Sequence, residues 1–127
     1  MAEKRRAILL VDHGSVRAEA NDVLHEIARL VSGEAPSFHV EVAHMELAEP
    51  TIAQGFSACV AAGAEEVIVQ PYLLAPGRHA QDDIPRLVEE AARQHQGVEF
   101  RVTAPLGVDR RLAQLIVERV KETDGRD

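Results

Sequence analysis

The chain has 127 residues, a length that suits one domain spanning residues 1–127. It carries 14 lysines and arginines against 21 aspartates and glutamates, for a net charge of −7, and only 3% of its residues are aromatic. A nucleic-acid partner is therefore not expected, because neutralising phosphates requires a basic face and stacking on bases requires aromatic side chains.

The single cysteine, Cys59, cannot form a disulfide within the chain. It lies on the apolar stripe of a predicted helix, which indicates a core thiol rather than a reactive nucleophile. The apolar run over residues 7–11 is too short for a signal peptide or a membrane span. We therefore expect a soluble, cytoplasmic protein without a membrane partner.

The first half of the chain alternates strand and helix patterns. Residues 7–11 are uniformly apolar, which is typical of a strand buried on both faces. Residues 16–32 follow helical spacing, and Gly33 is the expected stop of that helix. Residues 38–42 then alternate apolar and polar side chains, as in an edge strand. The pattern predicts one buried and one peripheral strand joined by a helix.

The second half repeats this alternation. A helix is expected with Pro50 at its first position and Gly63 at its stop, followed by a buried strand over residues 67–69. A long loop is then predicted over 72–81, followed by a helix capped by Asp82 or Asp83 and an edge-like strand over 98–102. The last predicted helix opens near Asp109, and its apolar residues are Leu112, Leu115, Ile116 and Val120.

Four strand–helix units in succession predict an α/β fold in which helices cover both faces of a parallel sheet. The two uniformly apolar strands belong in the centre and the two alternating strands at the edges. The expected architecture is therefore a flavodoxin-like three-layer sandwich with strand order 2-1-3-4. In such a sheet, ligands bind at the carboxyl ends of the strands.

Polar residues able to bind a metal follow three of these predicted strands: Asp12 and His13, then His44 and Glu46, then Arg78 and His79. His44 and Glu46 are two residues apart, so we expect them to share the buried face of the second strand. Imidazole and carboxylate together suit divalent iron, cobalt or nickel. We expect the other histidines, His25, His39 and His95, to lie on the surface.

Two alternatives of other classes remain open at this point. A non-catalytic metal carrier would keep the histidines and bind without accelerating any reaction. A phosphate-receiving domain would use Asp12 and would have no need of His79. No Gly-rich phosphate loop follows the first strand, so the sequence offers no separate support for a nucleotide site.

Three segments carry a family resemblance: LLVDHGS with Asn21 downstream, MELAEPTIAQGF, and VIVQPYLLAPGRHAQDDIP. Together they resemble the small CbiX-type sirohydrochlorin chelatases of the class II chelatase family, over about residues 7–120. The resemblance implies that the protein inserts cobalt, and by extension iron or nickel, into sirohydrochlorin for cobalamin or siroheme synthesis. It also implies a homodimer, and no cofactor beyond the metal that is the substrate.

The resemblance also assigns roles to residues. The paired metal-binding histidines of the family correspond to His13 and His79, and its acidic residue corresponds to Glu46, so we expect these three to be catalytic and to hold the metal. Arg78, with Ser15 and Arg17, is expected to bind substrate carboxylates.

Two positions depart from the usual family pattern. Asp12 stands where glycine is more common and could orient His13. His44 stands where an aromatic or aliphatic residue is usual, and it could add a fourth metal ligand.

Overall fold

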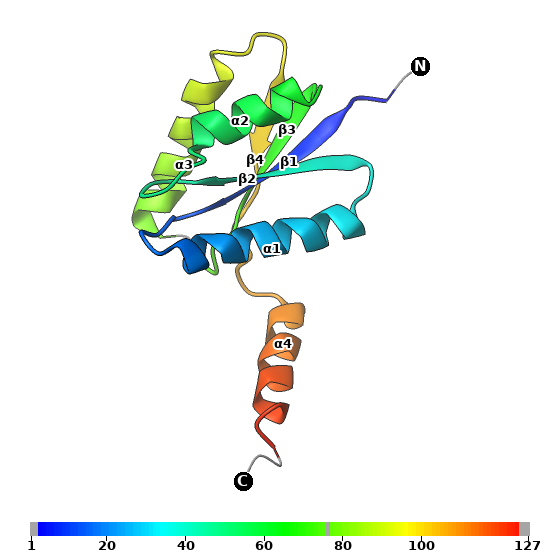
Figure 1. Cartoon of the computed structure of the whole chain (residues 1–127), viewed down its shortest axis with the longest axis vertical. Helices are drawn as coiled ribbons and strands as arrows, with labels where there is room; N and C mark the ends of the chain where they lie inside the picture. Colours follow the sequence, from blue (N-terminus) through cyan, green and yellow to red (C-terminus); the bar gives the residue numbers. More distant parts are fainter. Residues whose placement is uncertain (1–2, 76, 125–127) are drawn as a thin grey trace.

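The computed structural model describes residues 3–75 and 77–124, with the side chains of residues 78–81 outside that description. Strands and helices alternate along the chain (Figure 1) in the order β1 (Arg6–Asp12), α1 (Ala18–Glu34), β2 (Phe38–His44), α2 (Ile52–Ala61), β3 (Glu66–Pro71), α3 (Arg78–Ala92), β4 (Glu99–Val102) and α4 (Arg110–Lys121).

The four strands form one parallel sheet in the order β2-β1-β3-β4, as predicted. The apolar strands β1 and β3 occupy the centre, where Leu9, Val11, Val67 and Val69 are buried, and β2 and β4 are the edges. The strands end level with one another: Asp12 pairs with His44, and Val11 pairs with Pro71. Three strand ends therefore meet at a single edge.

Helices lie on both faces of the sheet, α2 and α3 on one and α1 on the other (Figure 1). The larger core lies under α2 and α3, where Phe56, Leu9 and Val69 are buried. Cys59 is wholly buried in the same core, as expected. A smaller core under α1 is built on Leu10, Leu24 and similar side chains.

Two predicted helix ends need correction. Helix α1 continues through Gly33 to Glu34, with Ala35 as its C-cap, because Pro36 disfavours a helical conformation in the residue before it. Helix α2 begins at Ile52 rather than Pro50, because Thr51 caps it: the Thr51 hydroxyl accepts from the backbone N–H of Gln54, and the Gln54 side chain accepts from the backbone N–H of Thr51.

The predicted loop over 72–81 is also too long. Helix α3 starts at Arg78, with Gly77 as its N-cap, rather than at Asp82 or Asp83. The helix runs through Pro85. Arg78 and His79 thus belong to the first turn of α3.

Helix α4 opens after Asp109, as predicted, and the Asp109 carboxylate accepts from the backbone N–H of Arg111. Its apolar stripe, however, does not pack on the sheet: no residue of α4 is buried, and the helix projects from the body (Figure 1). Among the described residues, no helix is both long and apolar enough to cross a membrane.

Candidate functional site

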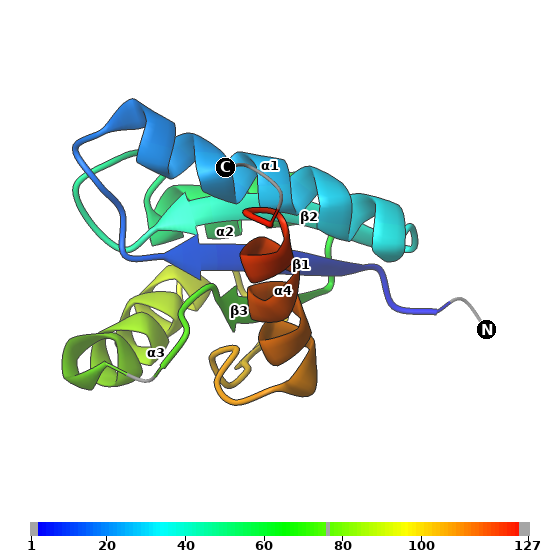
Figure 2. The same ribbon diagram turned by 90° about the horizontal axis from the view of Figure 1, so that it is seen from below.

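The carboxyl edge of the sheet gathers the loops that follow β1, β2 and β3. In Figure 2 the start of α1, the loop after β2 and the approach to α3 all lie at the left-hand edge, beyond the strand tips. A backbone hydrogen bond from Tyr72 N–H to Val11 O, 2.6 Å long, ties the third loop to the first strand. The predicted convergence of three loops is therefore confirmed at the level of the backbone.

Asp12 and His44 form a buried pair beneath this edge. The Asp12 carboxylate accepts a hydrogen bond from His44 Nδ1 over 2.6 Å, and His44 is wholly buried. Because an ionised carboxylate can only accept, Nδ1 is the donor in this bond. Nε2 has no hydrogen-bond partner among the side chains that the structure describes, and the ring of His25 lies 6.2 Å from that of His44, centroid to centroid.

This pairing bears on two expectations. Asp12 binds His44 rather than orienting His13. His44 does share the buried face of β2, as predicted from the parity of the strand, but its burial does not suit a ligand that must pass an ion to a large macrocycle. We assign the pair a structural role: it fixes the ends of β1 and β2 together under the site.

Glu46 lies outside the sheet, contrary to the prediction that it shares the buried face of His44. Strand β2 ends at His44, the chain then turns through Leu47 with a φ of 70°, and Glu46 is exposed. His13 is also exposed. The backbone N–H of Glu46 donates to His13 O over 3.1 Å, so the two predicted functional residues stand side by side on adjacent loops.

Gly14 makes this approach possible. Its φ is +90°, and a Cβ at this position would lie 1.8 Å from Glu46 O and 3.1 Å from His44 Cβ. Only glycine combines that conformation with so close a backbone contact. The glycine of the HGS motif therefore holds the first and second loops together rather than binding an anion.

Ser15 serves the loop itself. Its hydroxyl accepts from Arg17 N–H over 3.0 Å, while Asn21 accepts from Ser15 N–H and donates to Ser15 O. These three bonds fix the entry into α1, with Arg17 exposed as its N-cap residue. The structural role of Asn21 was not predicted, although the sequence analysis had associated Asn21 with the LLVDHGS segment.

The remaining expected residues, Arg78 and His79, follow β3 at the same edge, in the first turn of α3. Their side chains lie outside the described part, so the distance from the His79 ring to the His13 ring stays a prediction. Among the side chains that are described, no three His, Cys, Asp or Glu groups cluster as a metal site. His25 and His39 are exposed as expected, whereas His95 is half-buried and stacks on Phe56.

Comparison with known proteins points in one direction. The CbiX family model matches residues 7–123. The chain belongs to the CbiX family. It is 44% identical over 114 residues to the chloroplastic sirohydrochlorin ferrochelatase of Arabidopsis thaliana, covering 90% of this chain and 51% of that protein. It is 36% identical over 122 residues to the sirohydrochlorin cobaltochelatase of Saccharolobus solfataricus, covering 91% and 94% respectively.

Solved CbiX-family structures share the fold. The sirohydrochlorin chelatase SirB from Bacillus subtilis subspecies spizizenii, crystallised in complex with cobalt, superposes with a TM-score of 0.85 at 32% identity, covering 93% of this chain and 50% of SirB. The chain spans about half the length of several relatives that it matches, between 38% and 51%. The resemblance noted from the HGS, ELAEP and GRH motifs is thereby confirmed.

Proposed function

We propose that this protein is a sirohydrochlorin chelatase, a lyase that inserts a divalent metal into the tetrapyrrole. The family match over residues 7–123 carries the proposal. The position of His13 and Glu46 supports it, because both are exposed and adjacent at the carboxyl edge where an open α/β sheet binds its ligands.

Metallation replaces two pyrrole N–H protons with one metal ion, so the site needs a loosely held metal and a proton acceptor. We assign His13 and His79 as the ligands that present the ion, since neutral imidazole binds divalent first-row metals at neutral pH. Glu46 accepts the displaced protons or completes the metal shell. Few protein ligands are required, because the pyrrole nitrogens must replace them one after another.

The substrate implied by the family carries eight carboxylates, whereas the protein has a net charge of −7. Salt screens this repulsion beyond about 10 Å at 0.1 M ionic strength, so local cations decide binding. Arg78, next to His79, and Arg17, at the start of α1, are the proposed carboxylate partners. Ser15 contributes by shaping the loop, through the bond from Arg17 N–H to its hydroxyl.

The metal is cobalt or iron in the relatives named above, and nickel completes the set that His and Glu ligands accept. We propose no cofactor beyond this metal. We further infer that residues 1–127 act as one domain in a cytoplasmic homodimer, since a chain half the length of SirB matches one half of it.

The test is absorbance-monitored insertion of cobalt(II), iron(II) and nickel(II) into sirohydrochlorin. The proposal predicts turnover with at least one metal and its loss in both His13→Ala and His79→Ala. His39→Ala is the matched control, because this histidine is exposed on β2, away from the edge, and should retain the full rate. Tight binding of metal or tetrapyrrole without any acceleration would contradict catalysis and indicate a carrier.

A further inference from the structure

The buried ring of His44 is hydrogen-bonded on one side only. Its Nδ1 donates to the Asp12 carboxylate over 2.6 Å, whereas Nε2 has no hydrogen-bond partner within the part of the chain that the structure describes. Native proteins leave few buried polar groups unpaired, so an unpaired nitrogen calls for an ion, a water molecule or a ligand beside it. When the ring is neutral, donation from Nδ1 leaves the lone pair on Nε2. His44 then presents a nitrogen that is able to bind a metal.

A second imidazole lies next to this nitrogen. The ring centroid of His25, on α1, is 6.2 Å from that of His44, and the two ring planes make an angle of 62°. Metal–nitrogen bonds of about 2.1 Å to each ring would place the two centroids about 5–6.5 Å apart, depending on the angle at the metal. The observed separation falls inside this range. The rings are not stacked face to face, so their in-plane lone pairs are able to point to a common atom.

The fold brings the two rings together from distant parts of the chain. His44 shares the face of β2 that carries Val42, and Val42 packs under α1 against the buried Leu24. His25 directly follows Leu24 on α1, and its side chain is exposed. Helix α1 therefore places His25 over the end of β2, where His44 is the last residue of the strand.

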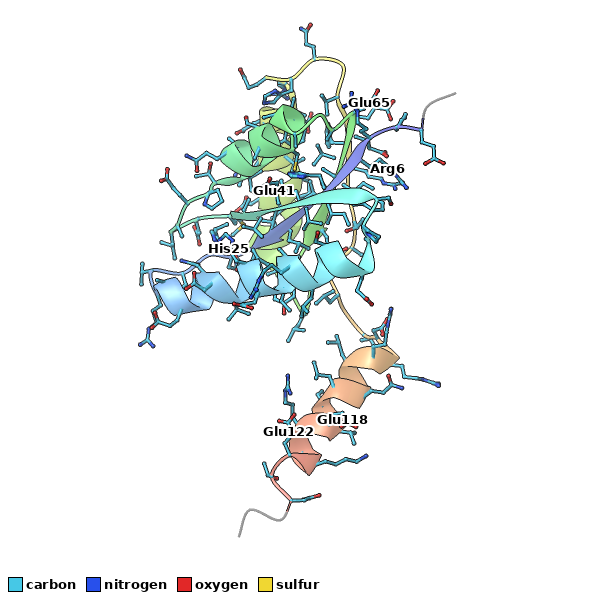
Figure 3. The ribbon with its side chains drawn as sticks, turned by 45° about the vertical axis from the view of Figure 1, so that its right-hand side comes forward. Arg6, His25, Glu41, Glu65, Glu118 and Glu122 are labelled. Atoms are coloured by element: carbon cyan, nitrogen blue, oxygen red, sulfur yellow. The ribbon has the colours of Figure 1, made fainter. Side chains whose placement is uncertain are left out.

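A hollow between α1 and β2 gives an ion a path to both rings. Its volume is about 430 Å³, and it is lined by His25 on α1 and Glu41 on β2 (Figure 3). Pro50 also lines the hollow and is a neighbour of His44, because His44 N–H donates to Pro50 O over 2.8 Å. At about 30 Å³ per water molecule, this volume holds a hydrated ion. Since His44 is wholly buried, the exposed His25 side chain must turn to admit the ion.

The charges around the hollow suit a cation. Arg29, which lines it, pairs with the Glu26 carboxylate one turn away on α1. Glu41 lies 2.5 Å from the exposed His39, oxygen to Nε2. The Asp12 carboxylate holds His44 in the way that a carboxylate commonly orients a metal-binding histidine. Among the described side chains no three His, Cys, Asp or Glu groups gather, so such a site has two protein ligands and its remaining ligands are water.

We propose that His25 and His44 bind a second divalent first-row metal ion, separate from the ion assigned to His13 and His79. His44 Nε2 and one ring nitrogen of His25 are the protein ligands, and Asp12 orients the His44 ring. Neutral imidazole suits ions such as zinc(II) and nickel(II). The bound ion links α1 to the end of β2 and is not passed to the tetrapyrrole, so the Asp12–His44 pair keeps its structural role. This inference goes beyond the proposed function and does not depend on it.

The first test counts the zinc(II) ions that the full chain binds, by isothermal titration calorimetry. A His13→Ala/His79→Ala variant lacks the assigned ligands of the inserted metal, and the proposal predicts that it still binds one equivalent. Adding His25→Ala should weaken this binding at least 10-fold, whereas adding His39→Ala, the matched control on β2, should leave it unchanged. No binding in the double variant, or binding unaffected by His25→Ala, would overturn the proposal. His25→Ala alone should keep the rate of metal insertion, and loss of that rate would contradict the separation of the two ions.

The second test uses the wild-type chain and needs no substitution of a buried residue. The ring 15N signals of the histidines are recorded by NMR with and without zinc(II). The proposal predicts that Nε2 of His44 and one ring nitrogen of His25 shift together, while Nδ1 of His44 keeps the proton that it donates to Asp12. A water molecule at Nε2 in place of a metal would leave both rings unchanged by zinc(II), and that result would refute the second site.

Discussion

Replacing Gly14 with alanine tests how the first and second loops are joined. At a φ of +90° a non-glycine residue is strained by about 1–3 kcal/mol. The new Cβ would also lie 1.8 Å from Glu46 O, so the second loop must move. That movement breaks the hydrogen bond from Glu46 N–H to His13 O, which is worth about 0.5–1.5 kcal/mol. The total expected loss in the free energy of unfolding is about 2–4 kcal/mol.

Gly33→Ala is the matched control. Gly33 lies inside α1, and no atom lies within 4 Å of the Cβ that alanine would add. Alanine there should stabilise the protein by about 0.5–1 kcal/mol, because glycine loses more backbone entropy in a helix. At about 4 °C per kcal/mol for a domain of this size, the melting temperature should fall by about 8–16 °C for Gly14→Ala and rise by about 2–4 °C for Gly33→Ala.

Thermal unfolding followed by circular dichroism measures both changes, and metal insertion at a temperature well below the transition measures the effect on the site. We expect Gly14→Ala to lose most of its activity even where it is folded, since His13 and Glu46 separate. A Gly14→Ala variant with an unchanged melting temperature would refute the close backbone approach. A lower melting temperature for Gly33→Ala would instead indicate that Gly33 ends the helix in a left-handed conformation.

Three further predictions follow from single contacts. Asp12→Ala should lower the free energy of unfolding by about 1.5–3 kcal/mol, since it removes the one hydrogen bond that the buried His44 ring makes to a described side chain. Equal urea midpoints for Asp12→Ala and for Asp12→Asn, which keeps an acceptor, would contradict this. Burial, with a smaller contribution from the nearby Glu41 charge, raises the pKa of Cys59 to about 12. The thiol should therefore resist alkylation at pH 8, and the free energy of unfolding should fall between about pH 9, where the unfolded thiol ionises, and about pH 12. Rapid labelling of the folded protein would refute the burial of Cys59. Thr51→Ala should cost about 0.5–2 kcal/mol by removing the cap of α2, and an unchanged urea midpoint would show that the cap is dispensable.

The strand order could be predicted because burial shapes the residue pattern directly. Residues 7–11 and 67–69 are uniformly apolar because β1 and β3 are the central, largely buried strands, and the alternation over 38–42 reflects an edge. The same parity placed His44 correctly but failed at Glu46, two residues further on. Parity holds only while the strand continues, and the left-handed turn at Leu47 ends it.

Other features depend on partners that a linear pattern does not specify. The Asp12–His44 bond requires the register of β1 against β2, which fixes which strand ends lie level. The start of α3 at Arg78 was missed because residues 72–81 contain proline and glycine and show no helical period, which indicated a loop. The apolar stripe of α4 indicates that some surface must cover it, but periodicity does not say which chain provides that surface.

The proposed metal insertion depends most on His13 and His79 binding the same metal ion. The protein is labelled with 15N at its histidines and titrated with cobalt(II), and NMR signals of the six imidazole groups are followed. We predict that the signals of His13 and His79 are paramagnetically shifted first and at equal metal equivalents, while those of His39 and His95 are unaffected. A shift of only one of the pair, or of His39 or His95 before them, would contradict a shared metal site at the carboxyl edge of the sheet.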